Sequence, residues 1–373
     1  MRTLVINAGS TNVKLSVLDS EAERFAVTVE HESPAAAVAD GLGQVRAKGL
    51  LPVDGVGHRI VHGGTAFTEA VLVTDDVMTQ LAALAELAPL HNPPALAALV
   101  EARKQLPDVP HVVAFDTAFH RTMSEIADTY PVPWEWTKTW GIKKYGFHGL
   151  SHAYCSGRAA ELLGRVGDKG LRVVVAHLGG GCSLCAVKGG MSIDTTMGFT
   201  PLDGLMMATR SGSIDPGIIL HVMRKHGLSV DDVDRILNKE SGLLGVSGVS
   251  SDMRDLWKAV THETNDHRIG TALEMFEYRI RLGVGAMAAA LNGLDALVFT
   301  AGIGEHDVQL RADVCSNLAV LGVKLDPQRN ASAGPDTDIS DPTATTRVLV
   351  LHTREDVTIA REVARVVSGE PAP

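Results

Sequence analysis

One pattern occurs twice in this sequence: a short β-rich apolar segment, a polar turn containing glycine, and a second segment in which apolar and polar residues alternate. The first copy runs from Thr3 to Val17 and turns at Ala8–Asn12, and the second runs from Arg172 to Lys188 and turns at His177–Gly181. Each copy predicts a β-hairpin, because apolar residues at period two form one buried face of a strand. Since about 100–200 residues form one domain, two such hairpins in 373 residues predict two similar domains.

The rest of the chain alternates strands with amphipathic helices. A third apolar strand, Ala296–Thr300, runs into a glycine turn at Ala301–Glu305, where backbone N–H groups could bind an anion. Further strands are predicted at His111–Asp116 and Arg347–Leu351, and helices at Val77–Leu87, Pro93–Leu106, Asp215–Lys225, Asp231–Asn238, Arg268–Leu291, Val308–Leu321 and Asp356–Val367. This order predicts an α/β fold of mixed sheets flanked by helices, with an irregular domain boundary at Thr129–Lys144.

Charge and composition exclude several classes of function. The formal net charge is −10 and no run of Lys and Arg occurs, which argues against binding to nucleic acid or anionic lipid. No stretch offers the roughly 18 apolar residues of a membrane span, and the polar Asn7 comes too early for a signal peptide. Four cysteines in so long a chain do not form a disulfide framework, so we expect reduced thiols and a cytoplasmic protein.

Two arginines lie in motifs rich in glycine and serine. Arg59 belongs to GHRIVHGG at Gly57–Gly64, and Arg210 belongs to TRSGS at Thr209–Ser213. Each could be a solvated residue of a turn, but a guanidinium group also binds a carboxylate or phosphate through two parallel hydrogen bonds. The presence of two such motifs favours an anionic substrate, which an acidic protein must bind locally.

Other polar residues allow both structural and functional interpretations. Asp116 follows an apolar strand, and carboxylates at strand ends face the ligand crevice of α/β proteins, although Asp is also a common helix cap. His148 alone is typical of a hydrogen-bonded structural histidine. Asp252 and Glu355 look like carboxylates at helix starts.

Cys182 and Cys185 form a CxxC pair within a predicted strand. No second cysteine pair or suitably spaced histidine pair accompanies them, and a strand would turn the two thiols to opposite faces. The spacing therefore argues against a zinc or redox site.

Together, these motifs resemble the acetate kinase family of the actin, sugar-kinase and heat-shock ATPase superfamily. The resemblance covers nearly the whole chain in long motifs in the family's order. The motifs are INAGS with Lys14 (Ile6–Ser10), GHRIVHGG, APLHNPP (Ala88–Pro94), FDTAFH (Phe115–His120), KYGFHG (Lys144–Gly149), MGFTPLDG (Met197–Gly204), TRSGSIDPG (Thr209–Gly217) and FTAGIGE (Phe299–Glu305).

The resemblance implies a phosphotransferase with a carboxyl group as acceptor. It would transfer a phosphoryl group reversibly and in line from ATP to acetate, giving acetyl phosphate and ADP, with Mg²⁺ or with Mn²⁺ in its place. The implied fold is two actin-like, ribonuclease H-like domains around a cleft: residues 1–120 with 356–373, and a nucleotide-binding domain of residues 121–355. A cytoplasmic homodimer in acetyl-CoA biosynthesis, with phosphate acetyltransferase as metabolic partner, is implied too.

The resemblance also implies roles for individual residues. Asp116, His148 and Arg210 would be catalytic: Arg210 and His148 would stabilise the equatorial oxygens of the transition state, and Asp116 would orient the substrate or a metal-bound water. Asn7 and Glu355 would lie near Mg²⁺. Acetate would contact Arg59, Val61, Leu90, His91, Phe147 and Pro201. Because acetate is already an anion, the reaction needs fixed positive charge more than a strong base.

The residues implied to bind the nucleotide come from several segments. They are Ser10, Asn12, Lys14, His177, Leu178, Gly179, Gly180, Gly181, Asp252, Met253, Arg254, Gly302, Ile303, Gly304, Glu305 and His306. The chain departs from the family mainly here, because Asn12 lies in a first turn that is usually Ser-rich and Gly180 and Cys182 replace side chains of HLGNGSS. His306 and Arg354 each stand where an Asn is usual.

Three hypotheses follow from these departures. The chain is an ATP-dependent acetate kinase that relies on backbone contacts to phosphate, and this is the hypothesis we favour. Alternatively, it keeps the chemistry with pyrophosphate or another nucleotide as donor, or with propionate as acceptor. In the third hypothesis it is a catalytically weak actin-fold protein that binds a nucleotide or acyl phosphate.

Overall fold

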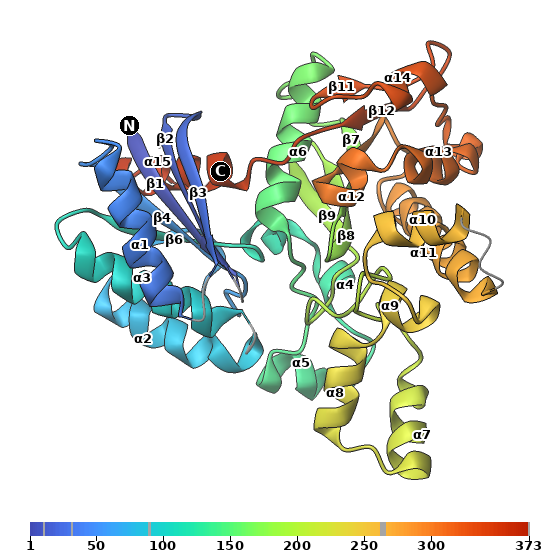
Figure 1. Cartoon of the computed structure of the whole chain (residues 1–373), viewed down its shortest axis with the longest axis horizontal. Helices are drawn as coiled ribbons and strands as arrows, with labels where there is room; N and C mark the ends of the chain where they lie inside the picture. Colours follow the sequence, from blue (N-terminus) through green and yellow to red (C-terminus); the bar gives the residue numbers. More distant parts are fainter. Residues whose placement is uncertain (10–11, 31–32, 89–90, 262–265, 372–373) are drawn as a thin grey trace. The chain divides into compact units, whose positions relative to one another are not determined.

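The computed structural model describes residues 1–9, 12–30, 33–88, 91–261 and 266–371. The chain forms two compact units, which we describe separately (Figure 1). The first unit contains residues 1–121, 147–154 and 354–373, and the second contains residues 122–146 and 155–353. No helix in the described ranges is long and apolar enough to cross a membrane.

A six-stranded mixed sheet forms the centre of the first unit, in the order β3-β2-β1-β4-β6-β5. Strands β1, β2 and β3 are antiparallel, β1, β4 and β6 are parallel, and β5 pairs antiparallel with β6. The strands are β1 (Arg2–Ala8), β2 (Asn12–Asp19), β3 (Ala22–Glu30), β4 (Gly55–Ile60), β5 (Val71–Leu72) and β6 (His111–Phe115). The hairpin predicted from Thr3 to Val17 is thereby confirmed.

Helices cover both faces of this sheet, because successive strand residues point to opposite sides. Leu4 and Ile6 of β1 pack with residues of α1 (Pro34–Ala47) and α3 (Asn92–Gln105), whereas Val5 packs with residues of α15 (Glu355–Ser368). Helix α15 lies close to β4, since a Cβ atom on Gly57 would stand 2.4 Å from Ile359. The C-terminal helix thus belongs to the first unit's core.

The second unit repeats this plan. Its sheet has the order β11-β12-β10-β7-β8-β9, in which β12, β10 and β7 are parallel and the remaining pairs are antiparallel. The strands are β7 (Arg172–Leu178), β8 (Cys182–Lys188), β9 (Met191–Thr195), β10 (Ala296–Thr300), β11 (Thr337–Asp338) and β12 (Arg347–Val350). Read from β3 and from β9, the two sheets have the same connectivity, so the prediction of two similar mixed α/β sheets is confirmed.

The remaining helices lie between these strands and are given in chain order. The structure places them at α2 (Asp75–Ala83), α4 (Glu125–Asp128), α5 (Trp134–Trp140), α6 (Gly149–Leu162), α7 (Pro216–His226), α8 (Val230–Lys239), α9 (Gly242–Ser247), α10 (Met253–Thr261), α11 (His267–Ala290), α12 (Ala301–His306), α13 (Val308–Ser316) and α14 (Pro327–Ala331). Every helix expected from the sequence has a counterpart among these helices or in α3 and α15.

Three local expectations were wrong. The predicted glycine turn at Ala301–Glu305 is the helix α12, which packs against β7 at Gly304. The stretch Thr129–Lys144 is not irregular throughout, because α5 forms within it. Helix α13 ends at Ser316, and a 3₁₀ turn replaces its predicted continuation.

Candidate active site

A buried ion pair joins the ends of two neighbouring strands in the first unit. Arg59, at the end of β4, donates from Nε to Oδ1 of Asp116 at 2.9 Å and from Nη2 to Oδ2 at 2.6 Å. The Asp116 side chain is 1% exposed. Burial by itself would lower the pKa of Arg59, but the charges of Asp116 and Glu355 raise it above its usual value. Arg59 therefore stays charged and is held in one orientation.

Two further oxygen-bearing side chains complete what we call the Arg59 cluster: Arg59, Asp116, Asn7 and Glu355. Asn7 Oδ1 accepts from Arg59 Nη1 at 3.2 Å, and Glu355 Oε2 lies 3.8 Å from Arg59 Nε. Asn7 is on β1 opposite Lys14 of β2, which is exposed. One positive charge thus faces two carboxylates within one unit.

The segment around His148 lies against the backbone of Asp116. Gly149 N donates to Asp116 O at 3.0 Å, and a Cβ atom on Gly149 would stand only 2.1 Å from that oxygen. His148 has a φ of 56°, a left-handed conformation that is uncommon outside glycine and clusters at functional sites. The motif KYGFHG therefore needs its last glycine so that His148 can be placed next to the cluster's carboxylate residue.

The sequence patterns did not reveal what holds the loop after Arg59. The buried side chain of Asn92 accepts from His62 N at 3.2 Å and donates to His62 O at 3.1 Å. Phe147 is buried beside His62, with ring centroids 5.4 Å apart, and Val61 is buried as well. The motif letters HNPP could have indicated Asn92, but only the pairing of two distant segments explains it.

Arg210 lies half-buried in the second unit. Its Nη1 donates to Pro201 O at 3.3 Å, and within the described ranges no carboxylate forms an ion pair with it. Burial lowers the pKa of Arg210, whereas the nearby Cys182 acts in the opposite direction. A partly desolvated cation without an acidic partner is suited to bind an anion.

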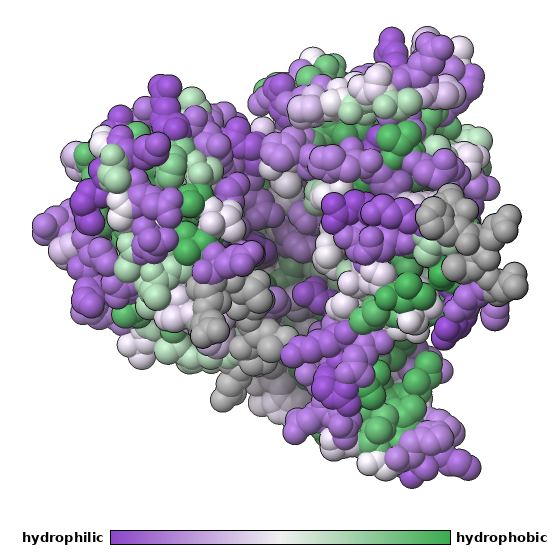
Figure 2. All heavy atoms as spheres, viewed as in Figure 1, coloured by the Kyte–Doolittle hydropathy of each residue, from purple (hydrophilic) through white to green (hydrophobic). Residues whose placement is uncertain are grey.

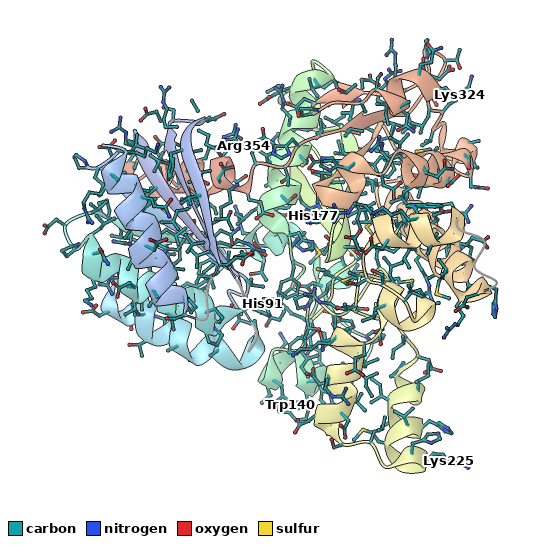
Figure 3. All side chains as sticks on the ribbon, in the orientation of Figure 1. His91, Trp140, His177, Lys225, Lys324 and Arg354 are labelled. Carbon is teal, nitrogen blue, oxygen red and sulfur yellow. The ribbon has the colours of Figure 1, made fainter. Side chains whose placement is uncertain are left out.

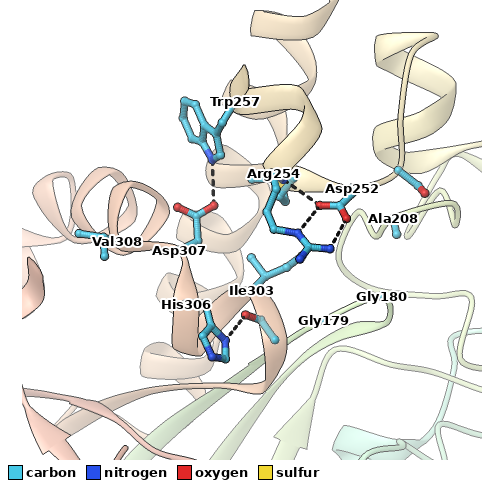
Figure 4. Close-up of a pocket in the computed structure, with 13 residues that line it drawn as sticks. Gly179, Gly180, Ala208, Asp252, Arg254, Trp257, Ile303, His306, Asp307 and Val308 are labelled. Atoms are coloured by element: carbon cyan, nitrogen blue, oxygen red, sulfur yellow. Dashed lines mark hydrogen bonds and ion pairs between the residues drawn. The ribbon is translucent and has the colours of Figure 1, made fainter. Parts of the chain in front are cut away.

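A cavity of about 830 Å³ lies within the second unit, and we call it the second-unit pocket. Figure 4 shows residues of α10 and α12 around it, with the Gly179–Gly180 turn. The lining residues are Gly179, Gly180, Ala208, Ser251, Asp252, Met253, Arg254, Trp257, Gly302, Ile303, His306, Asp307 and Val308. This volume is in the range of cofactor and nucleotide sites.

The wall formed by α10 combines helix capping with pocket lining. Asp252 accepts from Arg254 N at 2.9 Å and forms an ion pair with the Arg254 side chain at 2.6 Å. Hydrogen bonds from Arg254 lower the pKa of Asp252 to about 2, so the carboxylate is ionised. Trp257 Nε1 donates to Asp307 Oδ2 at 2.8 Å, which fixes the indole at the wall. Asp252 therefore accepts a hydrogen bond at the start of α10, as its helix-start interpretation predicted, and it also lines the pocket.

The opposite wall comes from α12 and the turn after β7. His306 Nδ1 lies 2.9 Å from Gly302 O, and because a carbonyl only accepts, Nδ1 donates. A Cβ atom on Gly180 would meet nothing within 4 Å. His177 lies at the end of β7 just before this turn (Figure 3). Burial raises the pKa of Cys182 to about 12, so its thiol stays protonated.

The structure does not gather all the expected nucleotide residues around this pocket. Gly179, Gly180, Asp252, Met253, Arg254, Gly302, Ile303 and His306 line it, whereas Asn12, Lys14, His177, Leu178, Gly181, Gly304 and Glu305 are not among its lining residues. Ser10 and Leu90 lie outside the described residues. Sequence patterns missed Trp257 and Asp307, although Trp257 lies one turn after Met253 on the same amphipathic helix.

Comparison with known proteins identifies the family. The sequence model of the acetokinase family matches residues 23–361. The chain belongs to the acetokinase family. An acetate kinase of Trichormus variabilis is 51% identical to it over 313 residues, which cover 84% of this chain and 76% of the relative. The family resemblance predicted from the motifs is thus confirmed.

Solved structures agree with this assignment at the level of the fold. The crystal structure of Porphyromonas gingivalis acetate kinase matches with a TM-score of 0.90 and 36% identity, covering 98% of this chain and 99% of that one. A propionate kinase from Francisella tularensis matches with a TM-score of 0.89 and 37% identity over the same shares. The two six-stranded sheets, which the sequence predicted as actin-like, therefore match the fold of a solved acetate kinase and a solved propionate kinase.

Proposed function

We propose that this protein catalyses the reversible transfer of a phosphoryl group from ATP to acetate, giving acetyl phosphate and ADP. As an acetokinase family member it is a phosphotransferase that acts on a carboxyl group. The Arg59 cluster is the observation that carries the proposal, because it provides a rigid, charged guanidinium and oxygen ligands at strand ends. In this proposal the Arg59 cluster binds the acceptor and the second-unit pocket binds the nucleotide.

On the acceptor side, the residues orient an anion that needs no deprotonation. Asp116 and Asn7 accept three of the five N–H groups of Arg59, so the two others, one on Nη1 and one on Nη2, are available in fixed directions for the acetate carboxylate. The buried Val61 and Phe147 form the apolar part of the acceptor site in this proposal, and each extra methylene of an acyl chain would change binding by about 0.8 kcal/mol. Leu90, His91 and Pro201 are proposed as its further members.

The Arg59 cluster also fits a divalent cation. Arg59 contributes one positive charge, and Asp116 and Glu355 contribute two negative charges, so the cluster by itself carries an excess negative charge that would oppose an acetate ion. Carboxylate and amide oxygens are ligands that Mg²⁺ prefers, and Mg²⁺ commonly takes only one or two carboxylates besides phosphates and water. Asn7 and Glu355 would hold it, and its charge would offset that of the transferred phosphoryl group.

The proposed transition-state residues are Arg210 and His148. Arg210 has no acidic partner among the described residues, so its charge is available to the equatorial oxygens of a phosphoryl group transferred in line. Asp116 acts by orientation, because its strong ion pair with Arg59 makes it a poor base.

On the donor side, we propose that ATP occupies the second-unit pocket, with its base and ribose between α10 and α12. The Gly179–Gly180 turn would offer backbone N–H groups to the phosphates, which supports ATP binding despite the departures at Gly180 and Cys182. Lys14, Asn12 and Ser10 would meet the phosphates from the first hairpin. The similarity to a propionate kinase keeps propionate as a second acceptor to test.

We further propose a cytoplasmic homodimer that works in acetyl-CoA biosynthesis with phosphate acetyltransferase. Helix α7 has no buried residue, and its Ile218 and Leu220 are each about half exposed. Figure 2 shows hydrophobic side chains over the lobe that carries α7 and α8. Exposed apolar residues that gather on one lobe support a contact with a second copy.

The test is acetyl phosphate formation, trapped with hydroxylamine, from the purified protein with acetate and Mg²⁺. ATP, GTP and pyrophosphate would be compared as donors, and propionate as acceptor. We expect turnover with ATP and acetate of about 1–100 s⁻¹ or above. Folded protein without turnover for any donor would overturn the proposal, and turnover with pyrophosphate alone would reassign the donor.

A further inference from the structure

Glu305 of α12 contacts its own helix and a distant segment rather than the second-unit pocket. Its Oε1 accepts from Ala301 N at 2.9 Å, and its Oε2 lies 2.8 Å from His352 Nδ1. Because an ionised carboxylate only accepts, Nδ1 of His352 donates. The Glu305 side chain is 11% exposed and does not line the second-unit pocket. Its carboxylate therefore connects the first residue of its own helix to a residue after β12.

The first residue of α12 adopts an unfavourable backbone conformation. Ala301 has a φ of 65°, in the left-handed region where a Cβ atom is strained. Thr300, at the N-cap position, makes no capping hydrogen bond with its side chain. Such a conformation persists only when neighbouring groups hold it, and the bond from Ala301 N to Glu305 is the side-chain contact that does so.

The other end of α12 is held by a buried arginine. Arg311 is 1% exposed, and its Nη1 donates to Gly304 O at 3.0 Å and to Glu305 O at 2.8 Å. Its Nε donates to Asn330 Oδ1 at 2.8 Å. Helix α12 is thus held by hydrogen bonds at Ala301 and at Gly304–Glu305. Its residues Gly302, Ile303 and His306 line the pocket.

We propose that Glu305 is a positioning residue for the donor nucleotide, acting through Ala301 and His352. By holding the strained start of α12, it keeps the pocket-lining residues of this six-residue helix in the shape that binds the nucleotide. The inference rests on the proposed function of the second-unit pocket. It assigns to Glu305 no contact with the nucleotide.

The test measures ADP binding by calorimetry and the KM values for ATP and acetate. Glu305→Ala should weaken ADP binding and raise the KM for ATP by about ten- to hundredfold, since a hydrogen bond to a charged group is lost. The KM for acetate should stay within about twofold. Glu305→Gln keeps an oxygen that can accept from Ala301 N. This variant should change the dissociation constant for ADP and the KM for ATP by less than about fivefold each. Glu161→Ala, which removes an exposed carboxylate paired with Arg158, is the matched control.

A rescue variant separates positioning from a general loss of structure. In Glu305→Ala/Ala301→Gly, glycine adopts the left-handed conformation without strain, so the KM for ATP should recover by at least about threefold. The inference is overturned by an unchanged ADP affinity in Glu305→Ala, by equal rises in both KM values, or by no recovery in the double variant. If instead the unaltered protein binds no ADP and forms no acetyl phosphate, the proposed function itself has failed.

Discussion

The Arg59 cluster and the second-unit pocket differ in the atoms that they present. The cluster is built from charged side chains, with Arg59 and Asp116 joined at 2.6 Å and Glu355 nearby. The pocket is built from a glycine turn, a short helix held at both ends, and an indole fixed by Asp307. A site built from side chains, such as the Arg59 cluster, depends on the chemical identity of each residue. A site built largely from a turn and a short helix depends on the backbone conformation of those segments.

This difference explains where the chain can depart from its family. By the resemblance described above, Asn7, Arg59 and Asp116 lie in motifs of the family. The departures at Gly180 and His306 lie in the glycine turn and the short helix, where backbone atoms also face the pocket, so a changed side chain need not remove every contact. The variants below test the comparison in order of decreasing expected effect.

Breaking the Arg59 cluster should have the largest effect. Asp116→Asn removes a buried charge whose loss leaves Arg59 poorly paired, at a cost of about 3–5 kcal/mol, so kcat/KM for acetate should fall about a thousandfold. Steady-state kinetics of acetyl phosphate formation would measure it. Asp75→Asn, which removes an exposed carboxylate paired with Arg103 at 3.2 Å, is the control in the same unit. A fall of less than tenfold would show that the cluster does not act as a unit.

Arg210→Ala should lower kcat by about a hundredfold and raise the KM for ATP much less. The physical reason is that a cation aimed at the transferred phosphoryl group stabilises the transition state more than the bound nucleotide. Arg329→Ala, in which an exposed arginine of the second unit is removed, should leave both constants unchanged. An equal or larger effect on KM would remove Arg210 from the proposed transition-state role.

A buried histidine pair in the first unit should make its stability depend on pH. His111 Nε2 donates to Leu106 O at 3.0 Å, so its Nδ1 must accept from His58 Nε2 at 2.9 Å, and both rings are neutral. Burial, chiefly, lowers the pKa of both histidines below the value of about 6.5 in an unfolded chain.

The unfolded chain therefore binds more protons than the folded one below about pH 6.5. The free energy of unfolding should fall as the pH decreases there, by at most about 1.4 kcal/mol per pH unit for each histidine. Urea denaturation between pH 7.5 and 5.5 would measure the slope, and the double variant His58→Gln/His111→Gln should flatten it. His226→Gln, at an exposed position, should keep the slope; an unchanged slope in the double variant would contradict the assignment.

Restoring the family's residues at the pocket should have the smallest effect. Gly180→Asn has open space for its side chain, and His306→Asn alters an exposed residue, so each should change kcat/KM for ATP by less than about threefold. The same kinetic assay with GTP as second donor would measure it. A gain above tenfold in either variant would mean that side chains, not the backbone, set donor binding.

The sequence alone determined the plan of the two units. The apolar runs around Val5 and Val174, each followed by a glycine-containing turn and a second strand, are local signals, and they predicted both hairpins and the mixed sheets because strand formation there depends on neighbouring residues. Asp116 could likewise be predicted as a functional carboxylate, since its place at a strand end follows from the strand itself.

Only the tertiary structure decided which groups meet. Arg59 and Asp116 are 57 residues apart, and no local pattern specifies that their charges form two parallel hydrogen bonds. The glycines of Ala301–Glu305 predicted a turn, but the buried Arg311 and the contact with His352 stabilise a helix there. The segment expected to bind the nucleotide thus presents Gly302 and Ile303 to the pocket and turns Glu305 away, because hydrogen bonds between distant segments outweigh local conformational preference.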